Sequence, residues 1–295
     1  MPAIADALGA SLRDYGGSGP PLVVVPSLIN PPRVLDLTGR SLLRWLAGRE
    51  SRVLLVDWGE DVDARRHLSV GGHVEAILLP FLGSIGESAH LAGYCLGGTM
   101  AVAAASLAPV RSLATIAAPW RFSGFPDQAR AEIAGLWQAA QPAAELLGLL
   151  PMEVLQSGFW SLDPARTVAK FERFATLDPT GEEAAAFVAL EDWANEGPPV
   201  GIAAAREMFE DLFAADLTGR GEWRVGGRVI DPAALSCPTL NIVSTTDRIV
   251  PAASAIGTGE RIDLALGHVG MVVGRRAREA VWHPLADWLS RTGAS

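Results

Sequence analysis

Gly93-Tyr94-Cys95-Leu96-Gly97-Gly98 is the stretch that decides the fold of this 295-residue chain. The apolar residues of His90–Gly93 predict a buried strand, and the small residues of Gly97–Leu107 predict a helix directly after it. A strand that turns sharply into a helix requires glycines around the turn, because a Cβ there would hold the two elements apart. The pattern G-x-C-x-G-G therefore predicts a nucleophile elbow with Cys95 at its tip.

Three glycines and one backbone amide would give this turn its chemistry. Gly93 and Gly97 are the positions where a side chain would collide, and Gly98 completes the elbow. The turn should raise the Cys95 sulfur above the sheet and direct the backbone N–H of Leu96 at the position of an oxyanion. The positive end of the following helix favours a thiolate. The alternative is a buried structural cysteine in a glycine-rich junction.

Short apolar runs alternate with helical stretches on both sides of the elbow. Strands are expected at 22–25, 52–56, 90–93, 113–117, 239–243 and 261–264, and helices at 34–47, 73–82, 97–107 and 277–289, with Pro80 kinking or ending the second. This alternation is typical of a mostly parallel sheet with helices on both faces. Together with the elbow, it predicts the α/β-hydrolase fold.

The pattern changes between residues 120 and 215, where strand runs stop and helical spacing takes over. Prolines are expected to break this region into short helices: Pro142, Pro151, Pro164, Pro179, Pro198 and Pro199. Its aromatic side chains, including Phe159, Trp160 and Trp193, are interpreted as packing residues. We therefore expect a core domain formed by 1–119 and 216–295, with a helical cap insertion at 120–215.

A thiol nucleophile needs a base, and the base needs an orienting acid. In this fold the chain order is nucleophile, acid, histidine. Of the two histidines after Cys95, His268 follows a predicted strand in a glycine-bounded loop, whereas His283 lies mid-helix and suits a packing role. Asp247 follows the preceding strand, so its carboxylate can orient His268. The sequence predicts Cys95, Asp247 and His268 as the catalytic residues, although a lone Asp in a loop is more often a turn former.

The loop after the first predicted strand should complete the site. A second oxyanion donor is expected there, from the backbone N–H of Leu28 or Ile29. Asn30 in the same loop, and Asp57 and Trp58 at the end of the next strand, are candidates for lining the pocket, with turn formation as the alternative for the last two.

Composition excludes several other classes of function. Hydrophobic residues make up 49% of the chain and the net charge is −9, so a nucleic-acid partner is not expected. The two cysteines fit free thiols in a reducing compartment, with Cys237 interpreted as structural. No leader or membrane-spanning stretch is expected, which predicts a soluble, cytoplasmic protein. His67, His73 and His90 lack metal-ligand spacing with the cysteines, so no metal is expected.

With these residues identified, the chain resembles the polyhydroxyalkanoate synthase family. The resemblance rests on the elbow and on six further segments: Pro26–Asn30, Val34–Leu37, Arg44–Leu46, Val56–Trp58, Asp247–Pro251 and Gly267–Val269. It implies transfer of a 3-hydroxyacyl group from a coenzyme A thioester to Cys95 and on to a hydroxyl, with no resident cofactor. His268 would be the general base, and Asp247 would orient it or assist the incoming hydroxyl.

The chain also differs from the synthase family in some features, and two alternative functions stay open. The chain reads as a short member without the family's N-terminal domain, Arg248 follows the acid where synthases often have histidine, and a homodimer is one assembly that the family allows. A hydrolase with the same three residues, either a thioesterase or a polyester depolymerase, is the first alternative. A non-catalytic binding protein that kept the fold is the second.

Overall fold

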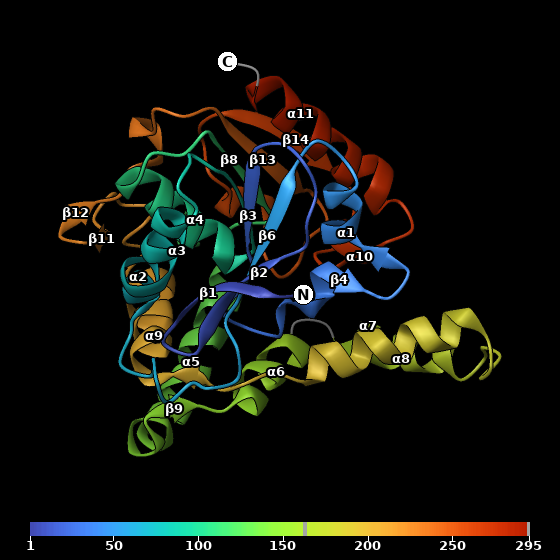
Figure 1. Ribbon diagram of the computed structural model, residues 1–295. Helices are drawn as coiled ribbons and strands as arrows, with labels where there is room; N and C mark the ends of the chain where they lie inside the picture. The colour runs from blue at the N-terminus through green and yellow to red at the C-terminus, as the bar shows by residue number, and fades with distance from the viewer. Residues whose placement is uncertain (162–163, 294–295) are drawn as a thin grey trace.

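The computed structural model describes residues 1–161 and 164–293, and its centre is an eight-stranded sheet with helices on both faces (Figure 1). The strands of this sheet are β1 (Ala3–Ala7), β2 (Ala10–Asp14), β3 (Pro21–Val25), β6 (Arg52–Asp57), β7 (His90–Tyr94), β8 (Ser112–Ile116), β13 (Thr239–Ser244) and β14 (Glu260–Leu264). The α-helices are α1 (Leu42–Ala47), α2 (Val70–His73), α3 (Leu79–Ser84), α4 (Leu96–Leu107), α5 (Asp127–Leu147), α6 (Met152–Ser161), α7 (Pro164–Phe174), α8 (Glu182–Asn195), α9 (Ile202–Arg206), α10 (Gly270–Val273) and α11 (His283–Gly293).

Shorter elements complete the described chain. The 3-10 helices are η1 (Pro32–Leu35), η3 (Phe122–Gly124), η5 (Pro232–Ala234) and η6 (Ala252–Ser254), and the π-helices are η2 (Val74–Leu78), η4 (Glu207–Ala214) and η7 (Arg278–Trp282). Two-residue strands pair as β4 (Asp36–Leu37) with β5 (Arg40–Ser41), β9 (Leu149–Leu150) with β10 (Val200–Gly201), and β11 (Arg224–Val225) with β12 (Arg228–Val229). No helix in the described ranges is long and apolar enough to cross a membrane.

The central sheet has the strand order β1-β2-β6-β3-β7-β8-β13-β14. Every neighbouring pair from β6 to β14 is parallel, and only β1 and β2 run antiparallel to their neighbours. The predicted mostly parallel sheet is therefore confirmed. Because the carboxyl ends of parallel strands meet at one edge, the loops after β3, β6, β7 and β13 lie at the same edge.

Alternate residues of the strands bury opposite faces of the sheet. In β3, Val23 and Val25 face the cluster that contains α4 and η2, whereas Leu22 and Val24 face the cluster that contains α1 and α11. All five residues of β3 are buried, as they are in β7 and β8. Strands covered on both faces read as continuous apolar runs, which is why they were recognisable in the sequence.

The sequence prediction missed the hairpin formed by β1 and β2. Both strands are rich in alanine and charge rather than in β-branched residues, so they carry little strand signal. A turn at Leu8 and Gly9, with φ of 49° and 79°, joins them. The pairing of β2 with β6 then extends the sheet by two strands.

Two predicted helices have different boundaries in the structure. The helix expected at 34–47 is reduced to α1, because Gly39 adopts φ of 75° and turns the chain into the β4–β5 hairpin. The segment expected at 73–82 is helical from Val70 to Ser84, and Pro80 does not end it. Pro80 lies where the π-helical turn η2 continues into α3, so the helix passes through it at an irregular turn.

The residues between β8 and β13 are mainly helical, but one proline prediction is wrong. α5 continues for 21 residues through Pro142. Pro142 and Gln138, whose carbonyl loses its helical partner, are both exposed, so water can satisfy that carbonyl. Trp160 is 52% exposed, so it is not a packing residue.

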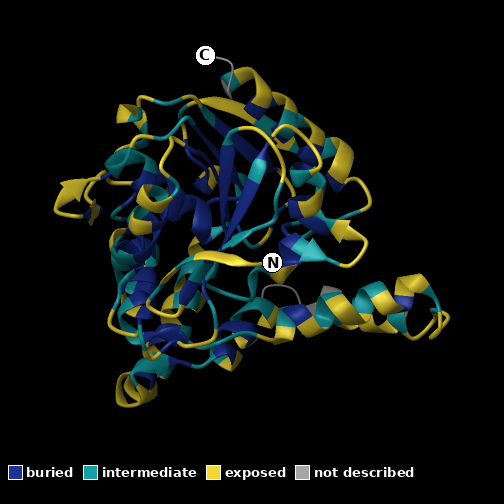
Figure 2. Ribbon diagram, in the orientation of Figure 1, coloured by how far each residue is buried: buried dark blue, intermediate teal, exposed yellow. Residues whose placement is uncertain are grey.

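Helices α7 and α8 form a hairpin that extends beyond the rest of the molecule (Figure 1). Phe174 and Phe187 stack between them with ring centroids 4.5 Å apart. Figure 2 shows that exposed and half-buried residues alternate along both helices, in contrast to the buried sheet. Val168, Phe171 and Val188 are 59%, 48% and 45% exposed, so apolar surface remains uncovered on this hairpin.

Candidate active site

Cys95 lies at the junction of β7 and α4 in a strained backbone conformation. Its φ is 55° and its ψ is −132°, which few residues other than glycine adopt. The turn is held by two hydrogen bonds, from Cys95 N–H to the Ile116 carbonyl (3.0 Å) and from Gly98 N–H to the Cys95 carbonyl (2.8 Å). Strain of this kind persists only where surrounding structure fixes it, and it is common at reactive residues.

The three elbow glycines leave no room for a side chain. A Cβ on Gly93 would lie 2.4 Å from the Gly98 Cα, and one on Gly98 would lie 2.3 Å from the Ala118 Cβ. A Cβ on Gly97 would lie 2.2 Å from the Val25 carbonyl oxygen. Gly97 is thus the point at which α4 touches the end of β3. Leu96 begins α4, so its N–H belongs to the first turn, whose amides have no acceptor within the helix.

Asp247 and His268 are joined by a short hydrogen bond, with His268 Nδ1 2.6 Å from Asp247 Oδ2. The other carboxylate oxygen, Asp247 Oδ1, accepts the N–H groups of Ile249 (2.8 Å) and Val250 (3.0 Å). Both residues are only 8% exposed. The carboxylate is thereby held in one orientation toward the imidazole.

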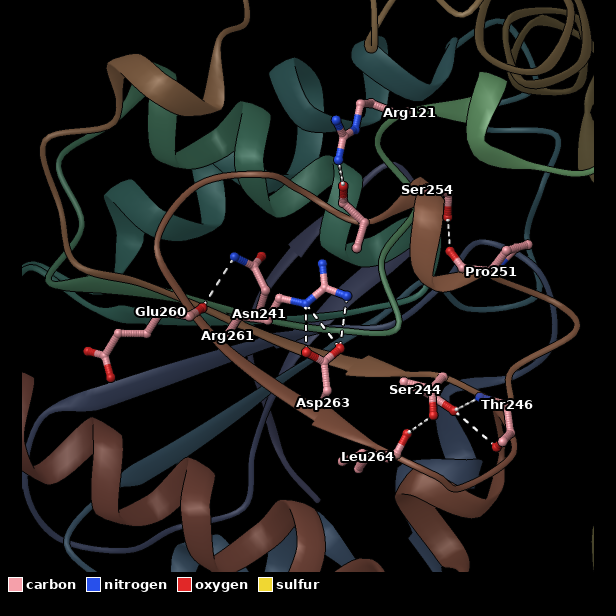
Figure 3. Close-up of polar contacts among 12 residues, drawn as sticks. Arg121, Asn241, Ser244, Thr246, Pro251, Ser254, Glu260, Arg261, Asp263 and Leu264 are labelled. Carbon is pink, nitrogen blue, oxygen red and sulfur yellow. Dashed lines mark hydrogen bonds and ion pairs between the residues drawn. The ribbon is translucent and has the colours of Figure 1, made fainter.

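A serine links the loops that carry these two residues. Ser244, at the carboxyl end of β13, donates its hydroxyl hydrogen bond to the Leu266 carbonyl and accepts from Thr246 N–H (3.1 Å). Figure 3 shows Ser244 and Thr246 at this strand end. The contact ties the Asp247 loop to the chain two residues before His268.

The electrostatics of the site favour a charged imidazole. Burial alone would lower the pKa of His268, but the negative charge of a Cys95 thiolate and hydrogen bonds with Asp247 and Cys95 raise that pKa to about 10. The ordinary value is 6.5, so the surroundings stabilise the imidazolium over the neutral ring. His268 therefore lies between Asp247, to which it is hydrogen-bonded, and Cys95, whose proximity raises its pKa.

Tyr94 is a neighbour of the site that sequence reasoning missed. Its ring lies against the His268 ring, with centroids 5.0 Å apart, and its hydroxyl donates to the His268 carbonyl at 3.4 Å. Burial raises the pKa of Tyr94 well above its ordinary value of 10.0, so the hydroxyl stays protonated. The position directly before the nucleophile was the only signal in the sequence.

The loop after β3 passes beside the elbow. Ile29 N–H donates to Ser27 Oγ at 3.1 Å, so this amide is already engaged. The spacing of Ser27 and Ile29 is that of a serine turn, a local pattern visible in the sequence. Of the two predicted donors, Leu28 is therefore the better candidate.

The three candidate pocket residues have different surroundings. Trp58 is 4% exposed and donates its indole N–H to the Pro26 carbonyl at 3.2 Å. Asp57 pairs with Arg13 Nε of β2 at 2.5 Å and accepts Gly59 N–H, so its carboxylate fixes the turn after β6. Asn30 extends its amide to the end of α8. Each of these three side chains therefore bonds a protein group, and Trp58 and Asn30 hold the loop after β3.

The remaining predicted residues lie outside this group. His283 meets the Trp45 ring edge-on, with centroids 4.8 Å apart, as a packing residue would. Burial raises the pKa of the Cys237 thiol above its ordinary value. Among the described residues, no three His, Cys, Asp or Glu side chains are grouped to hold a metal ion. Two surface cavities, of about 500 and 190 Å³, are lined by residues other than Cys95, Asp247 and His268.

No family model matches this chain. Curated relatives do, and they are named poly(3-hydroxyalkanoate) polymerase subunit PhaC. The protein from Haloferax mediterranei is 28% identical over 92% of this chain, and that from Haloarcula marismortui is 26% identical over 97%. The chain spans 58% and 64% of the length of these two relatives. The protein from Allochromatium vinosum is 27% identical, with 92% of this chain and 80% of the relative covered.

Solved structures resemble the chain in fold at lower identity. An esterase from Thermogutta terrifontis has a TM-score of 0.58 at 18% identity, covering 96% of this chain and 94% of its own. A hydrolase from Pseudomonas aeruginosa has a TM-score of 0.58 at 20% identity, covering 98% of this chain and 97% of its own. The predicted fold and the resemblance to the synthases are both confirmed. The chain has the α/β-hydrolase fold, and over nearly its whole length its sequence is similar to those of PhaC polymerase subunits.

Proposed function

We propose that the chain is a cysteine-dependent acyltransferase that moves a 3-hydroxyacyl group from a coenzyme A thioester to Cys95 and then to a hydroxyl acceptor. The observation that carries the proposal is Cys95 at the tip of a strained elbow, beside His268, whose Nδ1 lies 2.6 Å from Asp247 Oδ2. The 3-hydroxyalkanoate class comes from the relatives, whose names specify poly(3-hydroxyalkanoate) polymerisation, and the thioester comes from the resemblance to the synthase family.

The first step would acylate Cys95. The thiolate attacks the thioester carbonyl carbon, and the developing oxyanion accepts hydrogen bonds from the N–H groups of Leu96 and Leu28. The bond between the acyl carbon and the coenzyme A sulfur then breaks. Because Nδ1 of His268 is engaged by Asp247, Nε2 is the nitrogen available to give its proton to the departing sulfur, which leaves as free coenzyme A.

The second step would return the site to its starting state. Neutral His268 Nε2 removes the proton of the acceptor hydroxyl, and the hydroxyl oxygen attacks the acyl carbon on Cys95. The carbon–sulfur bond breaks, which regenerates the thiolate beside an imidazolium. Asp247 retains its negative charge throughout and stabilises the imidazolium in both steps.

An apolar environment around Cys95 would favour transfer to a hydroxyl over hydrolysis. Trp193 of α8 belongs to the apolar cluster on this face of the sheet, and Cys95, Leu190 and Ala194 are partly buried against it. A site covered by apolar side chains admits less water, and an acyl-enzyme then survives until an alcohol arrives. Coenzyme A thioesters are substrates of the cytoplasm, which is the compartment that this function implies.

The purified protein with 3-hydroxybutyryl-coenzyme A provides the test. We expect coenzyme A release, an acyl group on Cys95 by mass spectrometry, and oligomeric or polymeric ester as the product. Cys95→Ala should abolish all three, whereas Cys237→Ala, which removes the other thiol, should leave them unchanged. Free 3-hydroxy acid as the sole product would instead identify a hydrolase. Unchanged turnover by Cys95→Ala would refute the proposed nucleophile.

A further inference from the structure

Asn30 joins the loop after β3 to the end of helix α8. Its side-chain amide nitrogen lies 3.1 Å from the carbonyl oxygen of Ala194, 3.3 Å from that of Glu196 and 3.4 Å from that of Trp193. The last carbonyls of a helix have no partner within the helix, so an external donor there acts as a cap. Asn30 therefore closes the C-terminus of a helix that lies 163 residues away in the sequence.

Trp193 makes the reciprocal contact. Its indole N–H donates to the Pro31 carbonyl at 2.8 Å, and the residue is only 7% exposed. The Asn30 amide and the Trp193 indole thus donate in opposite directions between the loop after β3 and the end of α8. An exposed ion pair between Arg33 and Glu196 lies beside them and should contribute little.

The loop is consequently held at both ends by indole groups. Trp58, at the end of β6, bonds the Pro26 carbonyl, and Trp193, in α8, bonds the Pro31 carbonyl. Between these anchors lies Leu28, whose N–H is the second oxyanion donor in the proposed reaction. One anchor belongs to the sheet and the other to the helical region, so the position of α8 sets the position of this donor.

Asn30 is suited to this contact by its backbone. Its φ of 62° lies in the left-handed region, which asparagine and aspartate adopt more readily than other residues with a side chain. The conformation turns the chain between Leu28 and Pro31 and directs the amide at α8. Gly197, just after the helix, lies beside the Pro31 ring and adopts φ of 148°, a conformation that residues with a side chain rarely adopt.

We propose that Asn30 and Trp193 are positioning residues that couple helix α8 to residues 26–31, here called the oxyanion loop. The placement of α8 would thereby control the rate of acylation. This inference rests on the proposed acyl-transfer function. Displacement of a catalytic group by about 1 Å can cost about 100-fold in rate. Loosening the contact should therefore reduce kcat while KM for the thioester changes little.

Trp193→Phe is the first test, because it keeps the aromatic ring and removes only the N–H donor. Trp288→Phe is the matched control, since its indole N–H donates to Glu260 Oε1 (2.8 Å) at the β14 edge of the sheet and the residue is also buried, at 1% exposed. We expect Trp193→Phe to lower kcat about 10-fold or more. Trp288→Phe should change kcat less than twofold.

Asn30→Asp is the second test, because it preserves shape and left-handed φ but removes both N–H donors. The new carboxylate would face the carbonyl oxygens of α8, so the cap should be lost. Hydrogen–deuterium exchange then reports on the coupling without any need for activity. In both variants the amides of residues 27–30 and of 190–197 should exchange faster than in the wild type, and in Trp288→Phe they should not.

The outcomes separate this inference from the proposed function. Iodoacetamide should alkylate Cys95 within twofold of the wild-type rate in each variant, because the thiolate and His268 are untouched. Absence of acyl-Cys95 in the wild type would count against the proposed function. Unchanged exchange of residues 27–30 in both variants would overturn the coupling whatever the activity. Faster exchange with undiminished kcat would overturn the positioning role.

Discussion

The carboxyl edge of the sheet and the helical region between β8 and β13 are held together in different ways. At the sheet edge, backbone touches backbone: a Cβ on Gly97 would lie 2.2 Å from the Val25 carbonyl oxygen. In the helical region, the α7–α8 hairpin leaves apolar side chains such as Phe171 uncovered. The contacts of α8 with the oxyanion loop are side-chain hydrogen bonds from Asn30 and Trp193.

The difference shows where each part of the function can reside. Close-packed backbone has few alternative arrangements, so it holds reacting atoms in fixed positions. A helix attached by a few side-chain bonds can shift at small cost, so it can adjust access and alignment. Substitutions at the edge should therefore change chemistry directly, whereas substitutions in the helical region should act on stability or through the Asn30–Trp193 contact.

Asp247→Asn should have the largest effect on kcat among the substitutions at the two regions. The amide can still accept from Ile249 and Val250, but its NH₂ group would face Nδ1 of His268 and hold the proton on Nε2. We expect kcat to fall by about 10³- to 10⁴-fold with little unfolding. Kinetic measurement of coenzyme A release gives the change in kcat.

Asp216→Asn is the matched change at the boundary of the helical region. Asp216 is also buried and accepts backbone N–H groups, those of Phe122 (2.7 Å) and Ser123 (3.1 Å). Its loss should lower the urea midpoint and leave kcat of the folded enzyme nearly unchanged. A loss of kcat as large as that of Asp247→Asn would contradict the division between the two regions.

Gly97→Ala and Gly135→Ala should have effects of opposite sign. The first forces a Cβ against the end of β3, which should cost about 1–3 kcal/mol and displace the Leu96 and Leu28 amides. The second adds a Cβ in open space on exposed α5, which should stabilise by about 0.5–1 kcal/mol. Urea unfolding of both variants checks the signs, and destabilisation by Gly135→Ala would show that α5 is not free on that side.

Two buried histidines should give stability opposite dependences on pH. The pKa of His268 is raised to about 10, so its stabilisation is complete below its unfolded value of 6.5 and is lost as pH rises through 10. The stability difference between wild type and His268→Gln should therefore shrink between pH 7 and pH 10.5 in urea titrations. A difference that grew over this range would contradict the imidazolium–thiolate pair.

His73 is the second buried histidine, and its effect on stability should have the opposite dependence on pH. Burial lowers its pKa to about 4, although a bond to the Ser69 carbonyl partly offsets this. The folded state then binds the proton less tightly than the unfolded state, so His73 should cost stability as pH falls from 6.5 toward 4. His73→Gln should reduce that acid sensitivity, with no effect on the alkaline side, as measured by the same urea titrations.

Trp58→Phe should have a smaller effect on catalysis than Asp247→Asn. It removes the bond to the buried Pro26 carbonyl, which should cost about 1–2 kcal/mol of stability. Because Pro26 is the sheet-side anchor of the oxyanion loop, kcat should fall several-fold. Trp137→Phe, which removes an indole bond to Glu210 within the helical region, should cost similar stability without changing kcat. Equal kcat for both variants would show that Trp58 does not hold the oxyanion loop in place.

The elbow could be predicted from the sequence because it depends on local rules. Glycine is required wherever backbones approach within van der Waals contact, so the spacing of Gly93, Gly97 and Gly98 is visible without a structure. Buried strands such as β3 and β7 leave continuous apolar runs. Asp247 and His268 followed from their positions after consecutive strands.

Other features depended on groups far apart in the chain. Pro142 should have broken a helix, but exposure of the neighbouring carbonyl to water allows α5 to continue. β1 and β2 have weak strand propensity and exist because β6 offers a free edge for pairing. Asn30 was a candidate for lining a pocket, but nothing in its neighbourhood indicated a partner in α8.

The mostly parallel sheet and the sharp turn at Cys95 could be predicted from the residues alone. These features follow from steric exclusion and apolar periodicity, which act between residues close together in the chain. Which helix holds the β3 loop became visible only in the three-dimensional structure. That choice depends on hydrogen bonds such as that from the Asn30 amide to the Trp193 carbonyl, whose partners are 163 residues apart in the chain.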